Sequence, residues 1–206
     1  GWFSYTDEGN SGASTVSFLT DADGNWAAAS EGYESSYSLS LSYRLDKGNY
    51  EFDPYVGWGV NVPTSVNINA IGGLSYWYKG GKHTVRVETS DITDHDVHSY
   101  TVNASYANWK LVTVRFQDLM QEGWGIPVDF KKENITAISF QAKGSSKVRE
   151  DSLSIDYLYL MDTSEVAKDQ PDMVIRTPEI PEVEIGDIAI SNPLQEKAMK
   201  YLDKGV

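Results

Sequence analysis

The sequence lacks cysteine, long apolar runs and an excess of basic residues. Without cysteine, the chain has no disulfide, no thiol nucleophile and no thiolate ligand for a metal. Its 17 Lys and Arg against 30 Asp and Glu give a formal net charge of −13. Such a chain repels nucleic acid, whose phosphates are bound mainly by Lys and Arg. No apolar stretch approaches the ~18 residues of a membrane-spanning helix, so we expect neither a nucleic acid nor a membrane as partner.

Motifs of common catalytic sites are missing as well. The sequence contains no G-x-S-x-G nucleophile elbow, no H-E-x-x-H metal motif, no phosphate loop and no dinucleotide fingerprint. Acidic residues are so frequent that two neighbouring carboxylates do not by themselves indicate a glycoside hydrolase. The E-x-D-x-E pattern of jelly-roll glucanases does not occur. A binding role is therefore favoured, and a jelly-roll polysaccharide-degrading enzyme is the alternative.

A two-residue period of apolar and polar side chains extends from about residue 14 to residue 162. In 36–45, SYSLSLSYRL, Tyr37 shares one strand face with the apolar residues at positions 39, 41, 43 and 45. Similar runs occur at 55–62, 74–79, 84–89, 100–105, 110–116, 136–142 and 153–160. Many short strands without a helical pattern predict an all-β fold, an antiparallel β-sandwich or jelly roll of the galactose-binding-like kind. Tyr157 and Tyr159 have apolar neighbours two residues away and are expected in its core.

The composition changes after Asp162, so we expect the sandwich to comprise residues 1–162. Residues 163–191 are acidic and contain several prolines, which predicts an extended linker. Residues 192–206 then begin like a helix, with Asn192 as N-cap and Pro193 in the first turn. We expect this helix to be the start of a truncated downstream domain.

Aromatic residues next to glycine are the best indication of a binding surface. Nineteen of the 25 aromatic residues are Tyr or Trp, which carry a polar group as well as a ring. Along 55–60, Tyr55 and two glycines share one strand face, whereas Trp58 shares the other face with valines. A glycine beside a ring leaves room for a flat ligand such as a sugar. Trp124, between Gly123 and Gly125, repeats the pattern. Trp58 is either a sugar platform or a core residue.

Polar residues that could bind sugar hydroxyls gather in residues 90–98. This segment contains Asp94, Asp96 and His98, and it is either a set of hydrogen-bonding groups for a polar ligand or a solvated loop. Gln121 and Gln141 can add amide groups of the kind that bind hydroxyls.

Three segments resemble family 11 carbohydrate-binding modules. GWFSYTDEG resembles the W-x-S-Y-x-x-E-G opening of that family, WKLVTVRF (109–116) its W-K-x-x-x-x-x-F strand, and LSIDYLYL its closing strand with a central Asp. The resemblance covers residues 2–162. It implies a β-jelly-roll whose concave face binds β-1,4-glucan and mixed-linkage β-1,3-1,4-glucan, together with a structural calcium ion.

The resemblance also implies roles for single residues. Tyr5 matches a sugar-stacking tyrosine of the family. A second stacking position falls at Gly57, with Tyr55 on the same face, and a third falls near Trp124. Asp94 matches a hydrogen-bonding aspartate. The sequence departs from the family at 120–122, where Met-Gln-Glu replaces an arginine, and at position 142, where alanine replaces an aromatic residue.

The end of the sequence, EKAMKYLDKGV, resembles the segment that leads into glycoside hydrolase family 5 catalytic domains. This implies the binding part of a secreted, extracellular plant-cell-wall-degrading glucanase, a monomer attached in cis to its catalytic domain, with any signal peptide upstream of this chain. The predicted carbohydrate-binding residues are Tyr5, Tyr55, Trp58, Asp94, Asp96, His98, Gln121, Trp124 and Gln141, and the predicted calcium ligand is Asp156, on the closing strand.

Overall fold

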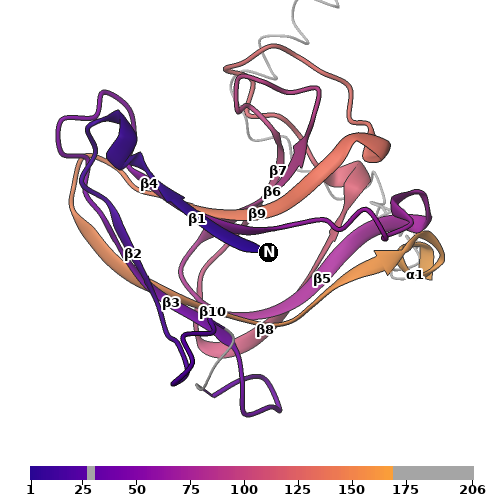
Figure 1. The fold of residues 1–206 in the computed structure, drawn as a ribbon, viewed down its shortest axis with the longest axis horizontal. Coiled ribbons are helices and arrows are strands. Elements are labelled where there is room, and N and C mark those ends of the chain that lie inside the picture. The colour runs from indigo at the N-terminus through magenta and orange to yellow at the C-terminus, as the bar shows by residue number, and fades with distance from the viewer. Residues whose placement is uncertain (27–30, 169–206) are drawn as a thin grey trace, which may run out of the picture. The chain divides into compact units, whose positions relative to one another are not determined.

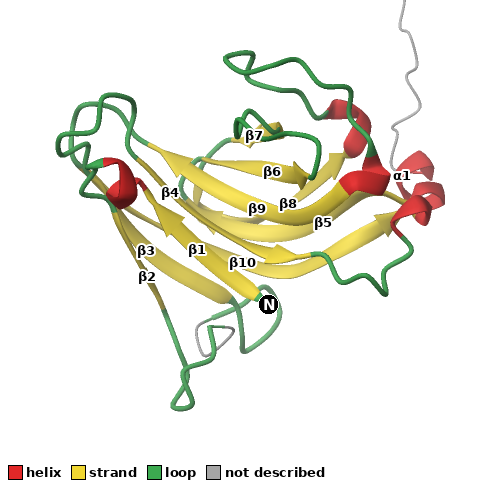
Figure 2. Ribbon diagram, turned by 45° about the horizontal axis from the view of Figure 1, so that its top comes forward, coloured by secondary structure: helices red, strands yellow, loops and turns green. Residues whose placement is uncertain are grey.

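The computed structural model describes residues 1–26 and 31–168, which form two five-stranded antiparallel sheets packed face to face (Figures 1 and 2). Sheet A has the strand order β1 (Trp2–Thr6), β4 (Tyr55–Asn61), β9 (Ile135–Lys143), β6 (His83–Thr89) and β7 (His98–Val102). Sheet B has the order β2 (Thr15–Phe18), β3 (Leu39–Leu45), β10 (Arg149–Asp162), β5 (Ile71–Gly80) and β8 (Ser105–Arg115). The predicted all-β sandwich is confirmed.

The core lies between the sheets and is built by the two-residue period. On β3, Leu39, Leu41, Tyr43 and Leu45 are buried, while the residues between them are more exposed. Sheet A contributes Val85, Val87 and Phe140 to the same cluster. Tyr37 does not follow the pattern: it precedes β3 and is 63% exposed, because the strand begins three residues later than predicted.

A buried histidine links the two sheets through a tyrosine. His83 on β6 is almost fully enclosed, and burial lowers its pKa to about 4. Since the Gly81 carbonyl, 3.0 Å away, can only accept, Nδ1 carries the proton and donates to it. Nε2 then accepts from the Tyr76 hydroxyl of β5 at 2.8 Å. The buried His83 side chain is therefore neutral.

The prediction that Tyr157 and Tyr159 are core residues is wrong. Asp156 pairs with Trp77 and Tyr159 pairs with Ser75, so β10 contains one more residue here than β5. This β-bulge shifts the alternation. Tyr157 takes a left-handed backbone conformation with φ of 48°, and both tyrosines are about half exposed.

A short helix, α1 (Thr163–Lys168), follows β10 in the stretch predicted to be linker. The Thr163 hydroxyl donates to the Ala70 carbonyl at 2.8 Å, and Val166 is buried beside Gly72 of β5. The rest of the predicted linker and the predicted helix at 192–206 lie outside the described residues. Within the described ranges, no helix has the length and hydropathy required to cross a membrane.

Candidate functional site

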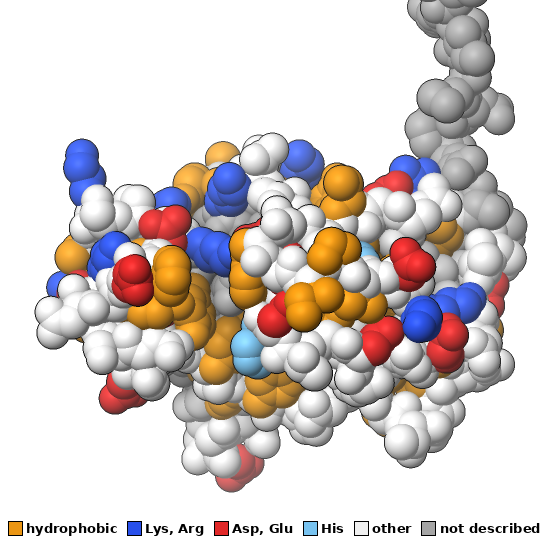
Figure 3. Space-filling model, turned by 90° about the horizontal axis from the view of Figure 1, so that it is seen from above, with side chains coloured by type: hydrophobic (Ala, Val, Ile, Leu, Met, Phe, Trp, Pro, Cys, Tyr) orange, Lys and Arg blue, Asp and Glu red, His pale blue; other side chains and the backbone are white. Residues whose placement is uncertain are grey.

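The outer face of sheet A carries most of the residues that the sequence singles out. On β4, Val56 and Trp58 enter the core, so Tyr55, Gly57 and Gly59 face outward, as predicted. They pair with Lys143, Gln141 and Ser139 of β9, which therefore lie on the same face. Figure 3, the view from above, looks onto this face and shows hydrophobic side chains gathered beside basic ones.

Three aromatic rings, which we call the aromatic row, lie on this face along β1 and β4. They belong to Phe3, Tyr5 and Tyr55, with ring centroids 6.3 Å apart for the first pair and 6.1 Å for the second. A Cβ atom added at Gly57 would lie 2.0 Å from the Tyr5 ring, and one at Gly59 would lie 2.7 Å from the Phe3 ring. The two glycines therefore let the rings lie down on the sheet.

A buried carboxylate fixes the start of β4 and with it Tyr55. Asp7 is fully buried and accepts from the backbone N–H of Tyr55 at 3.1 Å and of Ser14 at 3.0 Å. The Ser14 hydroxyl donates to the same carboxylate at 2.7 Å. The Asn10 amide donates to the Tyr55 hydroxyl at 3.2 Å, which fixes the outer end of the ring.

A buried ion pair forms the floor beside the aromatic row. Arg86 on β6 is 6% exposed, with Nε 3.6 Å from a carboxylate oxygen of Glu88, which also accepts from the Ser139 hydroxyl at 2.7 Å. Arg86 Nη1 donates to Gln141 Oε1 at 3.4 Å, which places Gln141 in this floor. Burial raises the pKa of the nearby Tyr5 hydroxyl, and the Arg86 charge partly offsets that effect.

Sequence reasoning missed this floor, although a signal was present. Arg86 and Glu88 alternate with the core residues Val85 and Val87 on β6, so strand periodicity already places them on the outer face. Two opposite charges two residues apart on the same face of a strand could have indicated an ion pair on this surface.

The rim of the site is formed by residues 121–128, here called the Trp124 loop. Asp96 is 1% exposed and accepts from three backbone N–H groups of this loop: Glu122 at 2.9 Å, Gly123 at 3.0 Å and Gly125 at 2.9 Å. Asp94 accepts from the N–H of Ile126 at 2.6 Å, and backbone hydrogen bonds from Ile126 and Asp96 lower its pKa. The two carboxylates hold the loop in its conformation.

Side chains also connect the Trp124 loop to sheet A. The Lys143 ammonium of β9 forms an ion pair with Glu122 at 2.5 Å, and the Trp124 indole N–H donates to the same Glu122 carboxylate at 3.3 Å. From the floor, Arg86 Nη2 donates to the His95 carbonyl at 2.9 Å, next to Asp96. The Trp124 ring remains 60% exposed, so one of its faces is available to a ligand.

Of the predicted binding residues, Tyr5, Tyr55 and Gln141 lie together on the outer face of sheet A, and Asp94 and Trp124 lie at its rim. The prediction for Trp58 is wrong: the side chain is fully buried and packs parallel to Phe140 with ring centroids 6.0 Å apart. Strand alternation directs it into the core.

Asp96 is enclosed by the loop, so the prediction that it binds sugar is wrong, whereas Gln121 is partly exposed and also positions the loop. The Asp96 carboxylate is enclosed by the three loop N–H groups. The Gln121 amide donates to the carbonyls of Asp96 at 2.7 Å and Ile126 at 3.0 Å, and it accepts from the Val128 N–H at 2.8 Å. Both side chains therefore have a structural role in the Trp124 loop.

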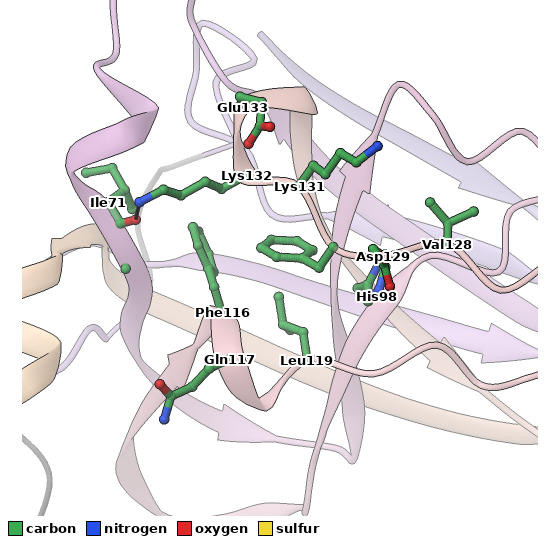
Figure 4. A pocket seen from close by; sticks show the side chains of 12 residues that line it. Ile71, His98, Phe116, Gln117, Leu119, Val128, Asp129, Lys131, Lys132 and Glu133 are labelled. Carbon is green, nitrogen blue, oxygen red and sulfur yellow. Dashed lines mark hydrogen bonds between the residues drawn. The ribbon is translucent and has the colours of Figure 1, made fainter.

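His98 faces a different hollow, and the prediction that it binds sugar is also wrong. It lies on β7 on the same side as the core residue Val102. Its ring packs edge to face with that of Phe130, and the two ring centroids are 5.1 Å apart. This hollow of about 660 Å³ is lined by Phe116, Leu119 and Lys131 among others (Figure 4). Burial lowers the pKa of His98, and strand alternation turns it away from the outer face.

Asp156, the predicted calcium ligand, is held by hydrogen bonds from neighbouring protein groups. One carboxylate oxygen accepts from the Tyr33 N–H at 2.9 Å and the Ser35 hydroxyl at 2.7 Å, and the other accepts from the Tyr157 N–H at 2.8 Å. Calcium takes six to eight oxygen ligands, and the Ser35 hydroxyl and Tyr37 carbonyl oxygens lie in the same cluster as the carboxylate, so a calcium ligand at Asp156 stays a prediction. In the part of the chain that the structure describes, no three His, Asp or Glu residues come together as a metal site. Asp156 holds the segment around Tyr33 against sheet B.

Comparison with known proteins supports the fold assignment. No protein-family model matches the chain. Endoglucanase 3 of Fibrobacter succinogenes is 51% identical over 208 residues, a match that covers 100% of this chain and 32% of that protein. The chain therefore spans about a third of the length of this curated relative.

Two solved structures are similar to the sandwich. The family 11 carbohydrate-binding module of a cellulosomal cellulase of Clostridium thermocellum aligns with a TM-score of 0.52 and 15% identity, over 78% of this chain and 87% of that one. The module from the same organism in complex with a β-1,3-1,4-mixed-linked tetrasaccharide gives the same score and identity, over 78% and 88% of the two chains. The chain has the β-sandwich fold of these modules, which confirms the resemblance at the level of the fold.

Proposed function

We propose that this chain is a non-catalytic module of a plant-cell-wall-degrading glucanase, and that it binds β-1,4- and mixed-linkage β-1,3-1,4-glucan on the outer face of sheet A. The observation that carries the proposal is the aromatic row lying flat on two glycines, with the exposed Trp124 ring at the rim. Pyranose rings have apolar C–H faces, and aromatic rings bind such faces by stacking.

The electrostatics of the face suit a neutral ligand. Arg86 and Glu88 are paired with each other, and Lys143 is paired with Glu122, so each of these two basic side chains is balanced by an acidic one. Hydroxyl groups of a sugar can hydrogen-bond to the Gln141 amide and the Tyr55 hydroxyl. An open face leaves part of the ligand in water, and we expect a Kd between micromolar and millimolar, roughly −8 to −4 kcal/mol.

The relatives supply the wider context of the proposal. The Fibrobacter succinogenes relative is an endoglucanase more than three times the length of the match, and one structural neighbour holds a mixed-linkage tetrasaccharide. We infer that this module is a monomer attached in cis to a catalytic domain, of glycoside hydrolase family 5, in a secreted enzyme. Any activity belongs to that domain.

Affinity electrophoresis tests the proposal directly. The chain is run in gels that contain mixed-linkage glucan, hydroxyethyl cellulose, xylan or mannan, beside a protein that binds none of them. We expect retardation by the two β-glucans and little by xylan or mannan. A reducing-sugar assay on mixed-linkage glucan addresses the alternative, because release of sugar by this chain alone would identify a jelly-roll enzyme.

A further inference from the structure

The outer face of sheet B carries a second group of exposed rings, on the side of the sandwich opposite the site described above (Figure 1). Tyr157 is 53% exposed, Tyr159 49% and Leu111 45%. They lie around Trp77 of β5, which pairs with Leu111 of β8 on one side and with Asp156 of β10 on the other. The Trp77 ring itself is covered by the ring of Tyr33, which stacks on it with centroids 3.5 Å apart. We call the exposed side chains Tyr157, Tyr159 and Leu111 the outer tyrosine patch.

The backbone departs from regular geometry where it forms this patch. In a regular strand, Tyr157 and Tyr159 would alternate with Asp156 and face the core. The bulge after Asp156 instead turns both tyrosines outward, and Tyr157 adopts a φ of 48°. A non-glycine residue in this conformation is strained, and bulges often redirect side chains at functional sites.

The patch is neutral and bordered by hydroxyl groups. Two opposite charges border it: Asp156, whose carboxylate oxygens already accept hydrogen bonds from Tyr33, Ser35 and Tyr157, and Lys79, two residues along β5 from Trp77. Beyond Asp156, serines occupy the outer face of β3 and β10, with the Ser40 and Ser154 hydroxyls 2.7 Å apart. A ligand that combines apolar faces with uncharged hydroxyls matches this surface.

The exposed area and the charge argue against a second copy of the chain. A fully covered aromatic side chain buries 150–250 Å², so three half-exposed side chains offer roughly 300 Å². A stable protein interface buries ~800 Å² per partner. Two copies with a formal net charge of −13 each also repel one another.

We propose that the outer tyrosine patch is a second carbohydrate-binding surface, which takes a β-glucan chain different from the one on sheet A. The ligand class rests on the proposed function, whereas the location rests on the patch itself. Because the two surfaces lie on opposite faces of the sandwich, one molecule can hold two polysaccharide chains at once.

The test is whether the full chain links two glucans. Insoluble β-glucan is loaded with protein and washed, and fluorescently labelled soluble mixed-linkage glucan is then added. The patch variant is Tyr157→Asn with Tyr159→Ser, because Asn tolerates a positive φ. The variant of the first site is Tyr5→Ala with Tyr55→Ala. Tyr106→Ser, a change at a tyrosine that is 55% exposed, is the control.

We expect the wild type and Tyr106→Ser to retain labelled glucan, and each double variant to retain at least fivefold less while remaining folded by circular dichroism. Retention by the patch variant equal to that of the wild type would overturn the second surface and leave the proposed function intact. Full binding of glucan by the Tyr5/Tyr55 variant, with loss in the patch variant, would instead overturn the first site. Sedimentation that shows a dimer only in the wild type would assign the patch to self-association.

Discussion

The aromatic row and the Trp124 loop contribute to the same site but are held in place by different means. Tyr5 and Tyr55 are placed by strand alternation and by the glycines beneath the rings. Trp124 is placed by carboxylates about thirty residues earlier in the chain, which accept hydrogen bonds from the backbone of its loop. The first half of the site depends on the pairing of β1 with β4 and on the Asp7 carboxylate that holds the start of β4. The second depends on side-chain carboxylates whose hydrogen bonds to the loop can be broken without touching a ring.

Asp96→Ala should have the largest effect and should act on the loop half alone. It leaves three N–H groups of a part-buried loop without their acceptor, and each hydrogen bond to a charged group contributes roughly 1.5–3 kcal/mol. We expect a loss of roughly 3–5 kcal/mol in unfolding free energy, measured by urea denaturation, and faster amide exchange at Gly123 and Gly125. Asp53→Ala, at an exposed acid, is the control. Unchanged exchange at these glycines would show that Asp96 does not hold the loop.

Lowering the pH should destabilise both halves of the site together, because protonation of the buried His83 destabilises the core. His83 is neutral in the folded protein, with a pKa of about 4 against 6.5 for the free side chain, so the unfolded state binds more protons below pH 6.5. Stability is therefore fully present above pH 6.5 and is lost as the pH falls toward 4, by roughly 3 kcal/mol. Thermal melts between pH 7 and pH 4 measure this. Since the pKa of Asp94 is lowered, exchange at the loop amides should not rise before global unfolding.

Gly57→Ala should damage the aromatic half. The added Cβ would lie 2.0 Å from the Tyr5 ring, so the ring must lift off the sheet. Overpacking of this kind costs ~1–3 kcal/mol, and we expect a matching loss of stability together with weaker retardation in glucan gels. Gly9→Ala, where nothing lies within 4 Å of the new Cβ, is the matched control. Retardation equal to wild type would mean that the ligand does not need the flat Tyr5 ring.

Trp124→Ala should have the smallest effect on stability and a clear effect on binding. The side chain is 60% exposed, so unfolding free energy should change by no more than about 0.5 kcal/mol. Loss of one stacking ring should weaken glucan binding by on the order of 1 kcal/mol, measured by calorimetry. Trp58→Ala provides the contrast, because truncating a buried aromatic costs ~3–5 kcal/mol. If both variants melt alike, the assignment of the two tryptophans to surface and core is wrong.

Sequence periodicity predicted the sandwich and the outward direction of Tyr55 because strand alternation is a local property of the chain. It gave the wrong environment where the register changes. A bulge after Asp156 exposes Tyr157 and Tyr159, which simple alternation places in the core. Such shifts depend on pairing with a neighbouring strand, which residue spacing along one strand does not reveal.

The sequence by itself determined the all-β class, the alternating core and the aromatic residues next to glycine, since each follows from the order of side chains along a strand. Only the tertiary structure decided which polar residues face a ligand and which hold the protein together. Asp96 and Gln121 look like sugar-binding groups in the sequence, yet their hydrogen bonds are made by backbone groups of the Trp124 loop. A carboxylate or amide has the same chemistry in either role, and the folded chain alone determines which donors reach it first.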